Sequence, residues 1–256
     1  MAEGEGDQRE GGGVTRLAIT PLMLALAVST YAYPAIARAQ SAPVEAAAAP
    51  ANLPLRLGEL LIPNKMMADK AAEGFDRNFK ASLAASPALD KQFSGAQEAA
   101  GTAARKLLID AVNANIGNLQ SEIAALIKNE FSDSEQRQLY VFLISPIGRK
   151  LVAMGDQALP SDDTRNEPVA NDSAPTIKLP DSVDGNALDK LSAVEKSSLA
   201  AFSVSPAGEK LSIVTPRLAQ LMENWANTLL ATNRPLVQQA MAVAIRDYRA
   251  NLESKK

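Results

Sequence analysis

The sequence of 256 residues contains no cysteine and no histidine. The chain can therefore form no disulfide, and it offers no thiolate nucleophile and no Ser-His-Asp or Cys-His arrangement. The nitrogen and sulfur ligands of ordinary zinc sites are missing as well. The side chain that most often transfers protons near neutral pH is also absent. No catalytic residue, metal site or cofactor is predicted from this composition.

Aromatic residues are scarce at 4% of the chain, and the net charge is only −3. Lysine and arginine form no cluster, so nothing in the charge pattern predicts binding to nucleic acid. Alanine and leucine are abundant, and both favour helices over strands. We therefore expect an all-α protein.

The first residues carry the pattern of an export signal. Arg16 stands before an apolar run at residues 17–28, and a small-x-small sequence ends at Ala39. A basic flank, a short apolar run and small residues at the exit are typical of a secretory signal peptide. The run is shorter than the roughly twenty residues that span a bilayer. We predict a signal peptide over residues 1–39, cleaved before Gln40, and a periplasmic mature protein.

Residues 1–13 are acidic and rich in glycine, unlike the basic start of a signal peptide. Translation is therefore expected to begin near Val14. An uncleaved membrane anchor is the alternative interpretation of the same segment.

A segment of twenty residues occurs twice, sixty positions apart, at 132–151 (the first copy) and 192–211 (the second copy). Nine positions are identical, whereas roughly one or two are expected by chance. We interpret the pair as an internal repeat. The shared positions are Ser132/Ser192, Glu135/Glu195, Leu139/Leu199, Phe142/Phe202, Ser145/Ser205, Pro146/Pro206, Gly148/Gly208, Lys150/Lys210 and Leu151/Leu211.

Each copy predicts two helices joined by a sharp turn. The serine and the glutamate three residues later form a capping box at the start of the first helix. The leucine and phenylalanine, three residues apart, share one face of that helix. The Ser-Pro pair ends the first helix and starts the second, with serine as the N-cap. The glycine lets the second helix approach the first closely.

The rest of the mature chain divides by composition. Residues 40–54 form an Ala/Pro-rich tether, residues 55–159 a helical region with the first copy, and residues 186–256 a helical region with the second. Between them, residues 160–185 contain four prolines and no apolar period, which predicts a flexible linker. That linker either separates two subdomains or loops off one bundle.

One long helix is expected in the first region, and helical segments interrupted at prolines are expected in the second. From Thr102 an apolar stripe runs through Leu108, Val112, Ile116, Leu119, Ile123 and Leu126. Gly95 and Gly101 are expected to loosen the residues before that stripe. In the second region, Pro216 is expected to kink or break the helix, and Asn233-Arg234-Pro235 to break it again.

The repeated pattern Ser-x-x-Glu-x-x-x-Leu-x-x-Phe-x-x-Ser-Pro-x-Gly-x-Lys resembles the signature of the domain-of-unknown-function family 2059. The two copies and their flanking helices cover most of residues 60–255. The resemblance implies an exported, all-helical bacterial protein and implies no activity. Family members often carry a second aromatic after the phenylalanine, whereas Leu143 and Ser203 stand there in this chain. This difference weakens the expectation of a shared aromatic pocket.

Few residues are candidates for chemistry, and most have a plainer explanation. Glu135 and Glu195 could act as catalytic acids only with a partner carboxylate or a raised pKa, whereas the capping box already explains both. Asp162, Asp163 and Glu167 lack the glycine and the terminal ligand of a calcium loop. We expect these three acids to lie in a solvated linker.

Two further groups are weighed as binding residues. Lys150 and Lys210 could contact an anionic lipid or glycan, but an exposed face among other charges is the favoured interpretation. Met222, Trp225, Tyr248 and Phe202 could line a groove for an apolar ligand or a partner helix. An ordinary core is the favoured interpretation for these four.

Three functions remain open. The first is a non-enzymatic interaction or scaffold module of the cell envelope, with an unknown envelope protein as partner. The second is a carrier of a lipid or other apolar ligand, and the third is a carboxylate-dependent hydrolase or lyase acting on peptidoglycan. The first needs an exposed apolar patch, the second an enclosed cavity, and the third two facing acids.

Overall fold

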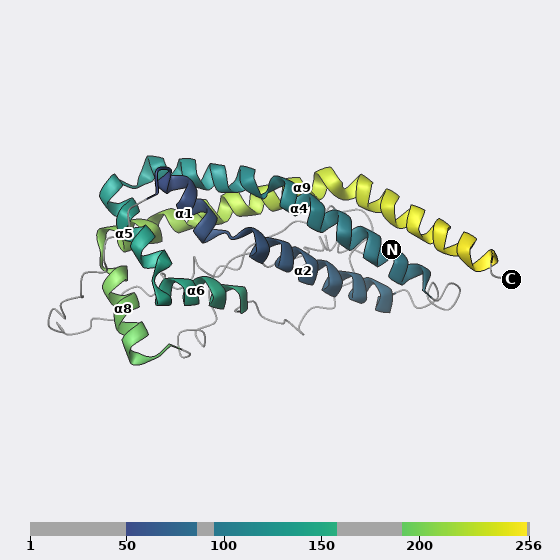
Figure 1. Cartoon of the computed structure of the whole chain (residues 1–256), viewed down its shortest axis with the longest axis horizontal. Coiled ribbons are helices and arrows are strands. Elements are labelled where there is room, and N and C mark those ends of the chain that lie inside the picture. Colours follow the sequence, from purple (N-terminus) through teal and green to yellow (C-terminus); the bar gives the residue numbers. More distant parts are fainter. Residues whose placement is uncertain (1–49, 86–94, 158–190, 255–256) are drawn as a thin grey trace, which may run out of the picture.

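The computed structural model describes residues 50–85, 95–157 and 191–254, and every element in them is a helix. The predicted signal peptide, the linker at 160–185 and residues 40–49 of the predicted tether lie outside the described residues. The predicted end of the tether is wrong, because its last two residues, Leu53 and Pro54, already lie in the first helix. The all-α prediction is confirmed. Figure 1 shows the helices in an elongated bundle: α1 (Leu53–Leu61), α2 (Asn64–Ala85), α4 (Ala96–Glu130), α5 (Asp133–Ile144), α6 (Pro146–Gln157), α8 (Ala193–Ser203) and α9 (Pro206–Glu253).

The bundle is organised around α4 and α9, which lie side by side along its length (Figure 1). They share the most extensive contact of any two described helices. The predicted stripe of α4 is buried from Leu108 to Leu126, and α9 buries Val214, Leu218, Met222 and Leu229. Each helix therefore supplies the apolar face that the other needs.

The first two helices cover α4 from the other side. A Cβ on Gly58 of α1 would lie 2.6 Å from the backbone oxygen of Gln120, so only glycine allows this approach. The buried amide of Gln120 donates to the Ile62 oxygen at 2.9 Å and to the Asn64 side-chain oxygen at 2.7 Å. This amide ties the α1–α2 junction to the middle of α4.

The predicted breaks in the last helix are wrong, because α9 continues for 48 residues through both Pro216 and Pro235. A proline inside a helix removes one backbone hydrogen bond and costs about 3 kcal/mol. Both prolines lie on the exposed side, where water can bind the carbonyl that lost its partner. The buried apolar side chains of α9, which lie between Ala207 and Leu229, contribute about 1.5–3 kcal/mol each, and this packing offsets the loss at Pro216.

The glycines before the stripe do not loosen α4 either. The helix begins at Ala96, and Gly101 lies buried within it. A Cβ at Gly101 would meet the ring of Phe79 at 2.4 Å, so this glycine makes room for an aromatic side chain of α2. Gly95, with φ of 89°, is the residue just before the helix.

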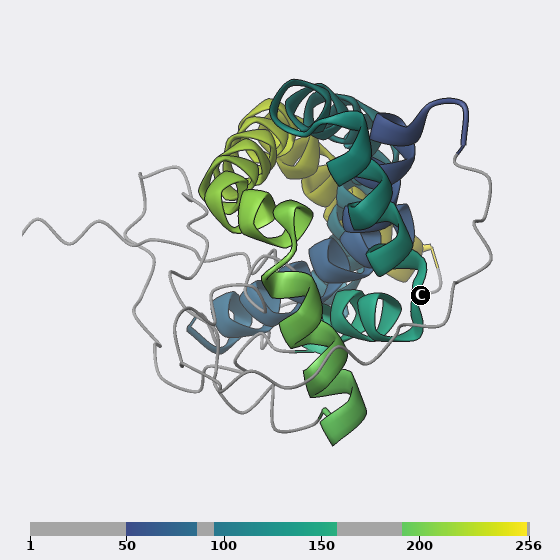
Figure 2. The ribbon, with the colours of Figure 1, turned by 90° about the vertical axis from the view of Figure 1, so that its left-hand side faces the viewer.

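One apolar core includes residues from both copies, among them Leu139 and Phe142 from the first and Leu199 and Leu211 from the second. The two helical regions therefore belong to one bundle rather than to two subdomains. Figure 2 shows α8 beside α6, at the end of the molecule where the two copies meet.

Candidate functional site

Both capping boxes form as the sequence predicts. In the first copy the Ser132 N–H donates to a Glu135 carboxylate oxygen at 2.7 Å, and the Glu135 N–H donates to Ser132 Oγ at 3.3 Å. In the second copy the same two bonds join Ser192 and Glu195 at 2.8 and 3.3 Å. Each glutamate thus closes the first turn of its own helix, α5 or α8.

The Ser-Pro turns are equally alike. Ser145 Oγ donates to the Phe142 carbonyl at 2.6 Å and accepts the Gly148 N–H at 3.1 Å. The corresponding distances at Ser205 are 2.7 and 3.2 Å. A Cβ on either glycine would lie 2.0 Å from the carbonyl oxygen of the preceding phenylalanine, Phe142 or Phe202. The predicted close approach at these glycines is confirmed.

The two copies meet through equivalent residues. The rings of Phe142 and Phe202 stack face to face, with centroids 3.7 Å apart and planes 5° from parallel. A residue that contacts its own counterpart lies at an approximate two-fold axis, as in the self-complementary interface of a symmetric dimer. No local pattern in the sequence predicts this stack.

A pair of lysine–glutamate interactions extends the same symmetry. Lys150 Nζ of the first copy lies 2.8 Å from both carboxylate oxygens of Glu195 in the second. In the reciprocal direction, the hydrogen bonds from Ser132 mainly lower the pKa of Glu135, and the charge of Lys210 adds a smaller effect without an ion pair. Both lysines are half-buried rather than on the exposed face that we expected. The first copy therefore binds the glutamate of the second through an ion pair, whereas the second copy acts on Glu135 only through the charge of Lys210.

These contacts determine how the two glutamates titrate. The hydrogen bond from Lys150 and the two from Ser192 lower the pKa of Glu195 to about 2. The backbone and hydroxyl of Ser132 are the main causes of the lowered pKa of Glu135. A general acid at neutral pH needs the opposite shift, so neither carboxylate is suited to that role.

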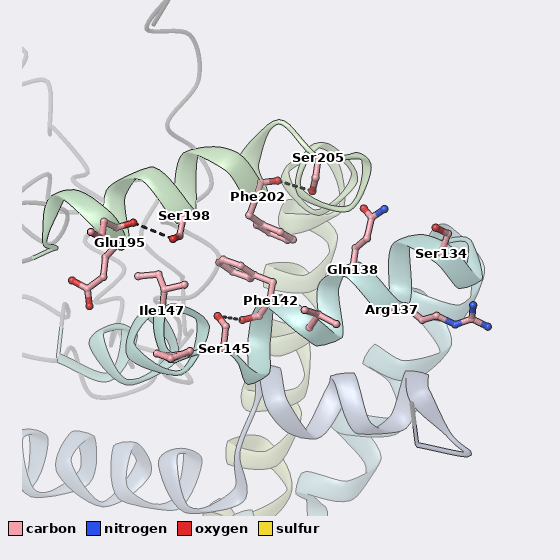
Figure 3. A pocket seen from close by; sticks show the side chains of 13 residues that line it. Ser134, Arg137, Gln138, Phe142, Ser145, Ile147, Glu195, Ser198, Phe202 and Ser205 are labelled. Atoms are coloured by element: carbon pink, nitrogen blue, oxygen red, sulfur yellow. Dashed lines mark hydrogen bonds between the residues drawn. The ribbon is translucent and has the colours of Figure 1, made fainter. Parts of the chain in front are cut away.

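A groove of about 750 Å³ opens between the two copies, and we call it the inter-copy groove. Figure 3 shows the stacked phenylalanines between its walls, with Glu195 near one end and Arg137 near the other. One wall is α5 and the other is α8, and the Ser-Pro turn after α5 adds Pro146 and Ile147. The lining comprises Ser134, Arg137, Gln138, Val141, Phe142, Ser145, Pro146, Ile147, Val194, Glu195, Ser198, Phe202 and Ser205.

The residues of the predicted aromatic groove lie at three different places. Phe202 lines the inter-copy groove, and Met222 is buried in the core with 1% of its surface exposed. Trp225 is half-buried against the core, and its indole N–H donates to the Asn115 carbonyl at 3.3 Å. Tyr248 lines a separate hollow beside Gly95. Sequence reasoning missed the groove that exists, although its floor is the one aromatic position shared by both copies.

In the described parts of the chain, no group of three or more acidic side chains could hold a metal ion. Asp162, Asp163 and Glu167 lie outside the described residues. None of the described helices is both long and apolar enough to cross a membrane.

The chain matches no protein-family model, and comparisons with curated proteins and with solved structures found no match either. The resemblance to the domain-of-unknown-function family 2059 therefore stays a prediction.

Proposed function

We propose that this chain is an exported helical protein of the bacterial cell envelope and acts as a non-enzymatic interaction module. Its binding surface is the inter-copy groove, which receives an apolar helical segment of a partner protein. The observation that carries this proposal is the stack of Phe142 and Phe202 on the floor of a groove that is open to solvent.

The rim of the groove supports the same function. Val141 has 39% and Val194 has 76% of its surface exposed, and both line the groove. Isolated exposed valines are common, but exposed apolar side chains gathered above two stacked phenylalanines, each with 8% of its surface exposed, favour an interaction site. Association would bury this apolar surface, which stabilises the complex by about 25 cal/mol per Å².

A carrier of a small apolar ligand is the second candidate, because the groove volume lies within the roughly 300–1,000 Å³ of typical ligand sites. A carrier, however, encloses most of its ligand, and this groove is open to solvent. A hydrolase gains no support from Glu135 and Glu195, whose pKa values are lowered by their own caps.

The proposal is tested by placing a photo-crosslinking amino acid at Val194 in cells that export the protein. Val204 provides a matched control, because it is a valine in the same copy with 75% exposure and does not line the groove. We expect a defined protein adduct at position 194 that is absent at position 204. Equal labelling at both positions, or no protein adduct at 194, would overturn the proposal.

Native mass spectrometry of the exported protein separates the two candidates. The carrier predicts a small molecule that co-purifies and is lost in Val141→Asp. The interaction module predicts a chain free of small ligand.

A further inference from the structure

We infer that the partner segment is an amphipathic helix of about three turns that places a carboxylate beside Arg137. This inference rests on the proposed function and specifies the chemistry of the partner. It follows from the hydrogen-bonding groups, the shape and the charge of the inter-copy groove.

The hydrogen-bonding groups favour a helix over an extended peptide. An extended segment needs partners for its backbone N–H and C=O groups once they leave water. The hydroxyls of Ser145, Ser198 and Ser205 already donate to carbonyls of their own copies, and the Glu195 carboxylate is held by Ser192 and Lys150. A helix forms its backbone hydrogen bonds internally, so it needs only apolar contact from the groove.

The shape favours a short helix with one polar face. The α5 wall is 12 residues long, which corresponds to about 18 Å or roughly three turns. Apolar residues spaced three and four apart can reach the phenylalanine floor from such a helix. The open side of the groove leaves the opposite face of the helix in water, where polar side chains are favoured.

The donors left over lie together on α5. Within the described residues, the Arg137 guanidinium has no hydrogen bond or ion pair, and Asp133, one turn earlier, does not pair with it. Gln138 uses its carbonyl oxygen to accept the Ala207 N–H at 3.4 Å, which leaves its amide N–H groups directed to no described acceptor. An unpaired guanidinium is complementary to a carboxylate.

The lining residues that α8 contributes from the second copy include no cation, and Lys196, the basic residue of that helix, does not line the groove. Ser197 and Ser198 stand where the first copy has Arg137 and Gln138. The lysine at the far end, Lys150, is already bound to Glu195 at 2.8 Å. An acidic side chain on the bound helix is therefore attracted to one end of the groove only.

The test is a selection from a display library of helical peptides about fourteen residues long. Each peptide carries an apolar face and is randomised at both ends, and the full mature chain is the target. We expect selected peptides to share apolar spacing of three and four residues and to be enriched in Asp or Glu at one fixed end. When the Arg137→Glu variant is the target instead, the selected peptides should carry Lys or Arg in place of that acid.

Affinities of one selected peptide provide the quantitative check. Arg137→Gln should weaken binding by about two- to fivefold, the effect of a rim ion pair. The Glu→Gln version of the peptide should bind with equally reduced affinity and should be insensitive to Arg137→Gln. Val194→Asp should abolish binding, whereas Val204→Asp, the matched exposed valine outside the groove, should leave it unchanged.

The outcomes separate the two proposals. Peptides that require Val194 but show no enriched acid overturn the inference about the carboxylate and leave groove docking intact. If no peptide binds, or if selected peptides bind Val194→Asp and Val204→Asp alike, the inference and the proposed use of the groove both fail.

Discussion

The two copies of the repeat have nearly the same local geometry but different anchoring. The cap and turn distances agree to within about 0.1 Å between the copies. The second helix of the first copy, α6, is 12 residues long, whereas that of the second copy, α9, runs for 48 residues along α4. Interactions between residues three or four positions apart therefore determine the turn in both copies. The packing of the helix that follows the turn determines how much of the bundle depends on that turn.

The largest expected effect concerns the residue pair that joins the copies. Phe142→Ala and Phe202→Ala should each destabilise the fold by about 3 kcal/mol, because each leaves a cavity under the other ring. The double variant should cost less than the sum, since the stacking of the two rings is lost only once. Urea unfolding of the four proteins measures this coupling. A purely additive result would contradict the pairing of the copies through their phenylalanines.

Substituting the two turn glycines should reveal the difference in anchoring. A Cβ at either Gly148 or Gly208 meets a backbone oxygen at 2.0 Å, which side-chain motion cannot relieve. We expect Gly208→Ala to cost about 3 kcal/mol and Gly148→Ala less, because a shift at the start of α9 disturbs the α4–α9 core.

Gly117→Ala in α4 is the control for these glycine variants, because its Cβ would meet nothing within 4 Å. It should stabilise the protein by about 0.5–1 kcal/mol in the same denaturation assay. Equal losses in Gly148→Ala and Gly208→Ala would show that the length of the following helix does not matter.

Removal of a serine cap should destabilise the protein less than these changes, and the region that it destabilises should differ between the copies. Ser132→Ala and Ser192→Ala each remove a cap worth about 1 kcal/mol. Since α8 has few neighbours, we expect Ser192→Ala to speed amide exchange mainly within α8, whereas Ser132→Ala should lower global stability. Ser198→Ala is the control, because its hydroxyl bonds only the Val194 carbonyl of its own helix. Identical exchange patterns in the two cap variants would contradict this difference.

The smallest effect is a pH dependence. Glu195 has a folded-state pKa of about 2 against an ordinary 4.5, so its contribution to stability is complete above about pH 4.5 and is lost as the pH falls toward 2. The difference in urea midpoint between the protein and Glu195→Gln should therefore shrink over that range. Glu135→Gln should show the same sign, because the pKa of Glu135 is also lowered. A difference that is constant with pH would exclude the charge of Glu195 as its source.

Local features of this fold were predictable from the sequence. The capping boxes and Ser-Pro turns form from residues within three or four positions of each other, so the pattern of Ser132, Glu135, Ser145 and Gly148 is sufficient to predict them. The stripe of α4 was predictable as well, because its period matches a helix over six apolar residues.

Features that depend on tertiary contact were not predictable. Pro216 and Pro235 both indicate breaks when only local geometry is considered, yet α9 continues through both, and at Pro216 the buried face of the helix outweighs the local preference. The groove between the copies requires Phe142 to meet Phe202, and no local pattern tells a stacked pair from two separate core residues. One signal was available: identical residues at a spacing of sixty are candidates to meet at a symmetry axis.

The approximate two-fold axis has a consequence for the direction in which a partner helix binds in the inter-copy groove. A groove whose two walls were identical would bind a helix equally well in either of two opposite directions. The residues that join the copies are the same in both, at Phe142/Phe202 and at the Ser-Pro turns, whereas the walls differ, with Val194 in place of Ser134 and Ser197 in place of Arg137. A helix that binds in the inter-copy groove therefore has one preferred direction.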